Sequence, residues 1–175
     1  MKINWLLLLL IPAGGLTAAE HPNVGTEIVR KTSQRSPIDD VLPSYFNLKE
    51  ALVAANVNDA AAAATDLTKQ LGKLSTPEAK QAATQAAAVA KAKKLQDQRV
   101  QFATLSESVY RLIKADQPSS TVYYQRCPMY NKGKGGNWLS NEQAIRNPYY
   151  GEQMLTCGSV VETVGEDKTE THTHE

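Results

Sequence analysis

Residues 75–90, STPEAKQAATQAAAVA, carry the clearest helix signal in the chain. Ser75 and Thr76 stand before Pro77 and Glu78, an order of residues that opens a helix, and alanine dominates residues 79–90. We therefore expect a helix to begin here. Its small side chains should allow close packing against the helical segment that precedes it.

Three further segments on either side of this one place apolar residues at spacings of three and four, which is the helical pattern. The first should begin near Asp39 or Asp40, because Pro43 is tolerated only in a first turn. The second should begin around Asp59, and the last should end near Ala115. The apolar stripes of the three segments are Val41, Tyr45, Leu48, Leu52 and Ala55; Ala63, Leu67 and Leu71; and Phe102, Leu105, Val109 and Leu112.

Short connections join the four segments, and a short connection leaves no room for a crossover between neighbours. The sequence therefore predicts an all-α fold, an antiparallel four-helix bundle followed by an irregular C-terminal loop region rich in Cys, Met and aromatic residues. A metal site inside such a bundle needs inward-facing Glu and His side chains. No histidine lies in these segments. We interpret the bundle as a scaffold.

The composition changes after Pro118, where Tyr, Gly, Asn, Pro, Cys and Met replace alanine. Two β-prone stretches, residues 121–124 and 159–164, enclose the loop region and are expected to pair as a short β-ribbon. Such pairing would bring Cys127 and Cys157 near each other.

Smaller features lie inside the loop region. Ser140 is a candidate cap for a brief helix over residues 141–146. Lys132 and Lys134 lie among glycines, but the full phosphate-loop pattern is not convincingly present. We interpret the Lys and Gly run as a solvated loop.

The two ends of the chain are predicted to lie outside the folded domain. Residues 1–19 combine a basic start, an apolar run and small residues at a cleavage site, which is typical of a secretory signal peptide. Its cleavage would leave a periplasmic protein without a membrane anchor. That protein would have a flexible arm over residues 20–37, one domain over 38–164 and a disordered tail over 165–175.

Net charge gives a further expectation about partners. The signal peptide contains one of the 19 Lys and Arg residues and none of the 18 Asp and Glu residues, so the mature chain is neutral. Nucleic acids and anionic membrane surfaces both favour proteins with a basic face. We expect neither to be the main partner.

Residues 124–158 contain both cysteines, Cys127 and Cys157, and every methionine except the initiator, namely Met129 and Met154. Two thiolates and two thioethers form a ligand set that favours Cu(I) or Ag(I) over harder cations. These four residues are the candidate metal site. The cysteines could equally close a disulfide, which is the default in an oxidising compartment. Only the methionines argue for metal, and methionine also commonly fills irregular gaps.

Motifs around these residues resemble a known family. The signature is similar to that of periplasmic domains of unknown function that occur alone or fused to the C-terminal end of copper/silver efflux adaptor proteins of the resistance-nodulation-division type. The resemblance covers roughly residues 38–164. It implies a helical bundle with a Cys/Met-bearing loop and an association with heavy-metal export. The matching residues are Cys127, Pro128, Met129, Gly135 or Gly136, Trp138, Leu139, Ser140, Ile145, Asn147, Pro148, Tyr149, Tyr150, Gly151, Met154, Leu155, Cys157 and Gly158, together with helical residues that include Tyr45, Phe46, Gln98 and Arg99.

The sequence supports two hypotheses about function. The first is an exported periplasmic protein that binds copper or silver and acts in heavy-metal efflux or homeostasis, with an efflux adaptor as partner. The alternative is a non-metal interaction module whose disulfide-stapled aromatic loop docks on an efflux adaptor or another envelope partner. An enzyme is not expected, because the folded region has no histidine to act as a base for Ser140 or the cysteines. The cysteines also lack the Cys-x-x-Cys spacing of thiol oxidoreductases.

Overall fold

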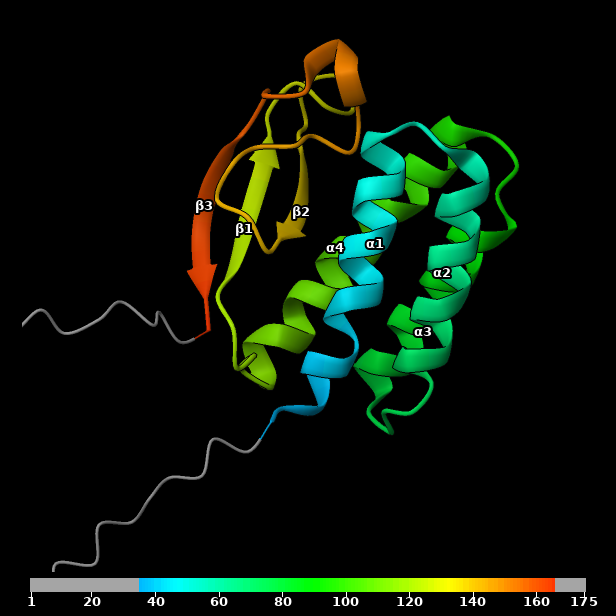
Figure 1. The fold of residues 1–175 in the computed structure, drawn as a ribbon, viewed down its shortest axis with the longest axis vertical. Coiled ribbons are helices and arrows are strands. Elements are labelled where there is room, and N and C mark those ends of the chain that lie inside the picture. Colours follow the sequence, from blue (N-terminus) through cyan, green and yellow to red (C-terminus); the bar gives the residue numbers. More distant parts are fainter. Residues whose placement is uncertain (1–34, 166–175) are drawn as a thin grey trace, which may run out of the picture. The chain divides into compact units, whose positions relative to one another are not determined.

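The computed structural model describes residues 35–165, which form four α-helices and a small three-stranded antiparallel sheet (Figure 1). The predicted signal peptide, residues 20–34 of the predicted arm and residues 166–175 of the predicted tail lie outside the described part of the chain. The elements in chain order are η1 (Pro37–Asp40), α1 (Leu42–Val53), α2 (Val57–Leu71), α3 (Pro77–Lys91), α4 (Leu95–Ala115), β1 (Val122–Cys127), β2 (Gly136–Ser140), η2 (Gly151–Met154) and β3 (Ser159–Val164), where η marks a 3-10 helix.

Helix α3 begins where the sequence predicts. Thr76 is its N-cap, the Oγ1 atom of Thr76 accepts a hydrogen bond from the Ala79 N–H at 3.1 Å, and Pro77 is the first helical residue. A side-chain oxygen at this position satisfies one of the N–H groups that a helix start leaves unpaired. The start signal in residues 75–78 is thereby confirmed.

Helix α2 begins two residues earlier than expected. Asn56 caps it: the Oδ1 atom of Asn56 accepts hydrogen bonds from the N–H groups of Asn58 and Asp59, both at 3.1 Å. Asp59 therefore lies in the first turn, where its negative charge is favourable. The helix ends at Leu71, and Gly72 is its C-cap.

Helix α1 begins at Leu42, two to three residues later than expected, because residues 37–40 form the 3-10 helix η1. In α1, Pro43 lies in the first turn, after the short 3-10 helix η1. Helix α4 ends at Ala115, as expected. Among residues 35–165, none of the helices combines the length and the apolar character needed to cross a membrane.

Consecutive helices pack against each other, and the contact between α2 and α3 is extensive. Ala60 and Ala64 of α2 and Ala82 and Ala86 of α3 are fully buried. Alanine has no side chain beyond Cβ, so the two backbones can approach closely. The close packing predicted for these two segments is confirmed.

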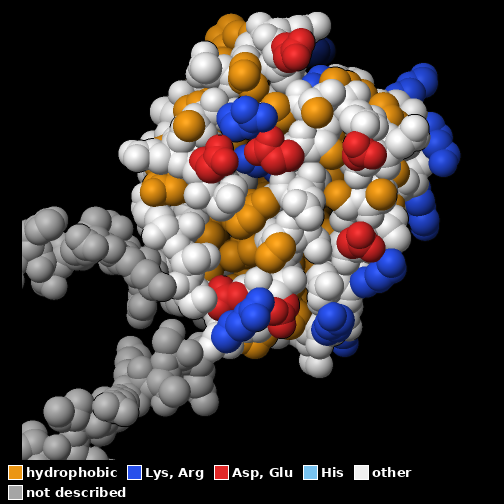
Figure 2. Space-filling view, in the orientation of Figure 1, with side chains coloured by type: hydrophobic (Ala, Val, Ile, Leu, Met, Phe, Trp, Pro, Cys, Tyr) orange, Lys and Arg blue, Asp and Glu red, His pale blue; other side chains and the backbone are white. Residues whose placement is uncertain are grey.

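The expectation of an all-α fold is incomplete, because the chain beyond α4 forms a sheet. Strand β1 lies in the middle and pairs antiparallel with β2 on one side and β3 on the other. The predicted pairing of the two β-prone stretches is confirmed, with Val122 opposite Val164. Strand β2 was not expected. It buries Trp138 and Leu139 and packs on α4, and hydrophobic side chains are visible between β2 and α1 in Figure 2.

The prediction of a brief helix over residues 141–146 is wrong, because the structure has no helix there. Ser140 ends β2, and its Oγ atom accepts a hydrogen bond from the Glu142 N–H at 3.1 Å, but residues 141–144 form bends and residues 145–146 are irregular. The buried Gln125 side chain donates to the carbonyl oxygens of Glu142 and Gln143 at 2.8 and 3.2 Å. A helix needs those carbonyl oxygens for its own N–H groups.

A buried lysine joins α1 to β2. Lys49 is fully buried, and its Nζ atom lies 3.3 Å from Ser140 Oγ and 2.5 Å from a carboxylate oxygen of Glu50. Arg146 pairs with the same carboxylate at 3.0 Å. Partial burial favours a higher pKa for Glu50, but the hydrogen bonds and charges of Lys49 and Arg146 outweigh it and lower the pKa. Glu50 therefore stays ionised and compensates the buried ammonium group.

Candidate functional site

The two thiols meet at the end of the sheet. Cys127 is the last residue of β1 and is fully buried, whereas Cys157 lies just before β3 and is partly exposed. Their Sγ atoms are 3.2 Å apart, and both cysteines are free. Pairing of β1 with β3 brings them together, since Arg126 lies opposite Ser159.

The methionines lie beside the thiol pair in the chain and expose their side chains. Met129 is 56% exposed and Met154 is 37% exposed. The backbone of Met129 forms a hydrogen bond with the Cys157 thiol, and the carbonyl oxygen of Met154 accepts one from the Cys157 N–H at 3.0 Å. Both methionines are therefore held next to Cys157 by their backbones.

The surroundings of the partly exposed thiol raise its pKa. The hydrogen bond with Cys127 raises the pKa of the Cys157 thiol above its ordinary value, and burial and the charge on Cys127 add to this. The hydrogen bond from the Met129 backbone acts in the opposite direction. A metal that binds Cys157 as thiolate must displace its proton.

Within residues 35–165, no group of three or more His, Cys, Asp or Glu side chains is placed to share a metal ion.

Asn147 fixes the segment that carries Cys157. It is fully buried, its Nδ2 atom donates to the Cys157 carbonyl oxygen at 2.9 Å, and its Oδ1 atom accepts from the Tyr149 N–H at 2.9 Å. Its own N–H donates to the Leu155 carbonyl oxygen at 2.8 Å. These bonds close residues 147–157 into a loop with Cys157 at its end. The Asn-Pro-Tyr-Tyr-Gly pattern was the sequence signal for this role, but it did not identify the partners.

The residue after Cys157 has to be glycine. Gly158 has a φ of +148°, and a Cβ atom there would lie 2.8 Å from the Arg126 carbonyl oxygen and 2.9 Å from Cη2 of Trp138. Both distances are shorter than real Cβ contacts. Glycine thus allows the chain after Cys157 to approach β1 and the buried Trp138 ring closely.

The aromatic residues of the loop pack inward. Trp138 and Tyr149 are buried and meet edge to face, with ring centroids 5.9 Å apart. The hydroxyl of Tyr149 donates to the Asn137 carbonyl oxygen, and Tyr150 donates to the Met129 carbonyl oxygen at 3.1 Å. These contacts fix the loop against β2 and hold the Met129 backbone in place.

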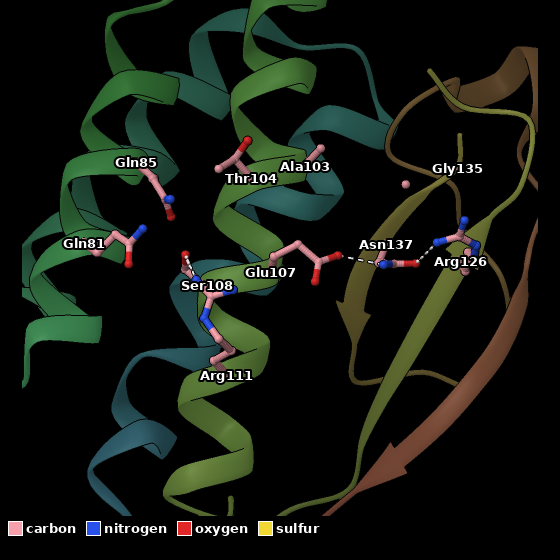
Figure 3. A pocket seen from close by; sticks show the side chains of 11 residues that line it. Gln81, Gln85, Ala103, Thr104, Glu107, Ser108, Arg111, Arg126, Gly135 and Asn137 are labelled. Atoms are coloured by element: carbon pink, nitrogen blue, oxygen red, sulfur yellow. Dashed lines mark hydrogen bonds between the residues drawn. The ribbon is translucent and has the colours of Figure 1, made fainter. Parts of the chain in front are cut away.

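A polar cavity of about 430 Å³ lies between α3, α4 and the sheet (Figure 3). Glu107 of α4 crosses it and accepts hydrogen bonds from Tyr124 at 3.0 Å and Asn137 at 2.6 Å. Arg126 of β1 donates to the other side of Asn137 at 3.1 Å. These hydrogen bonds tie α4 to the sheet, and the sequence did not predict them. No Cys or Met lines the cavity, so it is separate from the thiol pair.

Comparison with known proteins gives one match, in the helical part of the chain. No curated protein and no solved structure matches it. A family match covers α1 to α4 and ends just before β1, so it does not include the cysteines or Asn147. Residues 41–121 match the model of the family described as "Protein of unknown function (DUF3347)", and this part of the chain is a domain of unknown function.

Proposed function

We propose that the chain is an exported copper- or silver-binding protein that holds one metal ion at Cys127, Cys157, Met129 and Met154. The observation that supports this most strongly is the free thiol pair, whose Sγ atoms are 3.2 Å apart, with an exposed methionine close in sequence to each cysteine. Thiolates and thioethers are soft ligands that select Cu(I) and Ag(I).

The spacing of the sulfurs suits a shared ion after a small movement. Two sulfurs that each lie about 2.3 Å from one ion in tetrahedral geometry are about 3.8 Å apart. The Sγ atoms would therefore separate by about 0.6 Å from their present 3.2 Å. Cys127 is fixed in a strand, whereas Cys157 is partly exposed outside one, so Cys157 is the residue that would move.

Export determines when the site would be available. A signal peptide over residues 1–19 would send the chain to the periplasm, where thiols oxidise readily. Oxidation would join the two sulfurs and leave only Met129 and Met154 as ligands. We propose that the reduced protein is the form that binds metal tightly.

The proposed partner is based on the resemblance to domains fused to copper/silver efflux adaptors. A chain that carries Cu(I) near its surface could pass it to such an adaptor, because Met129 and Met154 are exposed and thioether ligands exchange with a partner's ligands. The role proposed is buffering or transfer of the metal in heavy-metal efflux.

A double variant, Met129→Ala with Met154→Ala, tests the four-ligand site. Reduced protein is titrated with Cu(I) against a chromogenic chelator that competes for the metal. We expect the double variant to bind Cu(I) at least about tenfold more weakly. Loss of a residue that only supports a ligand already lowers metal affinity by about 10- to 100-fold, and loss of a ligand itself should cost at least as much. Val161→Ala is the matched control, since Val161 is also an exposed apolar residue, at 50%. Unchanged affinity in the double variant would exclude the methionines as ligands.

A second candidate is the non-metal interaction module. The 56% exposed Met129 gives the aromatic loop an apolar side chain that an efflux adaptor or another envelope protein would contact. The thiols are also close enough to form a disulfide after a small movement. Non-reducing peptide mapping separates the two candidates. A quantitative bridge between Cys127 and Cys157 that persists in metal-replete cells favours the module, and free or metal-bound thiols favour the metal site.

A further inference from the structure

A cavity of about 350 Å³ lies where α4, the β1–β2 loop and the turn before η2 come together. The residues that matter for its chemistry are Arg99, Val100, Tyr130, Lys132, Tyr149 and Tyr150. Its volume falls within the range of small-molecule sites, which are usually apolar clefts with a few placed polar groups. No sulfur atom lines it, so this cavity is not the proposed metal site itself.

Arg99 is a buried cation with few partners. Its side chain belongs to a residue that is only 8% exposed, and its Nη2 atom donates to the Leu52 carbonyl oxygen at 3.1 Å. Its Nε atom is buried without a hydrogen-bond partner, and no carboxylate of residues 35–165 forms an ion pair with it. The end of α1 compensates part of the charge, because helix C-termini are partly negative. No carboxylate of the described residues compensates the rest.

The other lining residues favour an anion with a flat apolar body. Lys132 adds a second positive charge, and no Asp or Glu lines the cavity. Tyr130 and Tyr149 stack with ring centroids 4.0 Å apart, and Tyr150 meets Tyr130 edge to face at 6.3 Å. Aromatic walls provide contact area for a planar ring. The guanidinium group of Arg99 is always charged and therefore attracts a carboxylate.

We propose that this cavity binds a small aromatic carboxylate, with the ring against Tyr150 and Val100, beside the stacked pair Tyr130 and Tyr149, and the carboxylate directed toward Arg99 and Lys132. The ligand would provide the counter-ion that the described part of the chain does not give to Arg99. A neutral ring of the same size would gain the aromatic contacts but not the charge interaction.

Benzoate and benzamide are the test probes, because they have the same size and differ in charge. The full mature chain is titrated with each, and chemical shifts of tyrosine ring protons are followed by NMR. We expect saturable binding of benzoate and at least about tenfold weaker binding of benzamide, since hydrogen bonds to charged groups are roughly twice as strong as neutral ones. Equal binding of the two probes, or no saturable binding of benzoate, would overturn the proposal.

Two lysines of the same loop give a matched pair of variants. Both are exposed, but Lys132 lines the cavity and Lys134 does not. We expect Lys132→Ala to weaken benzoate binding by about two- to fivefold and Lys134→Ala to change it by less than about twofold, because charge contacts of exposed lysines are weak. Arg99→Lys should weaken benzoate binding more than Lys132→Ala does. Circular dichroism checks that the Arg99→Lys protein folds. Equal effects of the two lysine substitutions would contradict the assignment even if the Arg99 variant does not fold.

Discussion

Cys127→Ser is expected to lower the affinity of the reduced protein for Cu(I) by at least about a thousandfold, which corresponds to about 4 kcal/mol. Cys127 is fully buried at the end of β1, and its Sγ atom lies 3.2 Å from that of Cys157. Serine replaces a soft thiolate with a hard hydroxyl group that Cu(I) binds poorly. Competition with a chromogenic Cu(I) chelator measures the change.

The effect has to be separated from a loss of fold, because Cys127 is part of the core. Thermal unfolding of the metal-free variant, followed by circular dichroism, provides this control. Cys157→Ser is the second variant, since Cys157 is partly exposed and its replacement should disturb packing less. If folded Cys127→Ser and Cys157→Ser proteins both kept their Cu(I) affinity within about threefold, the thiol pair would not be the metal site.

Asn147→Ala is expected to lower the free energy of unfolding by about 2–4 kcal/mol, as for a buried residue whose partners are left unpaired. Alanine would leave the Cys157 carbonyl oxygen and the Tyr149 N–H without the partners that the Asn147 side chain provides. The segment that carries Cys157 would then loosen. Urea denaturation of the reduced, metal-free protein gives the change in free energy.

Asn147→Asp gives a sharper comparison at the same site. A carboxylate can still accept from the Tyr149 N–H but cannot donate to the Cys157 carbonyl oxygen, whereas a protonated carboxyl group can. Burial should raise the pKa of the introduced carboxyl group. Stability should therefore be partly regained in acid and lost as pH rises through that pKa.

Equal stability of wild type and Asn147→Ala would show that these two hydrogen bonds do not hold the loop.

Local signals predicted the helical part of the fold well. The Thr76 cap, Pro43 in a first turn and the end of α4 at Ala115 each depend on residues within a few positions of one another. The pairing of β1 with β3 was predicted from β-prone composition on both sides of the loop, and it brought the two cysteines together.

Features that depend on distant residues were missed. Strand β2 begins at Gly136 in a glycine-rich stretch, and its pairing with β1 and packing on α4 are tertiary contacts. Burial of Lys49 and Arg99 could not be predicted either, since a charged residue in a helical pattern usually faces water. Their partners, Ser140 and the Leu52 carbonyl oxygen, are 91 and 47 residues away in the chain.

X-ray absorption at the copper edge tests the central claim most directly. The reduced protein, prepared without residues 1–19, is loaded with one equivalent of Cu(I) and passed over a desalting column that removes loosely bound metal. The proposed site predicts that copper stays bound and that its nearest neighbours are sulfur atoms only, at about 2.3 Å as for other metal–thiolate bonds. Copper lost on the column, or a nearest-neighbour shell of nitrogen and oxygen, would contradict a site made by Cys127, Cys157 and the two methionines.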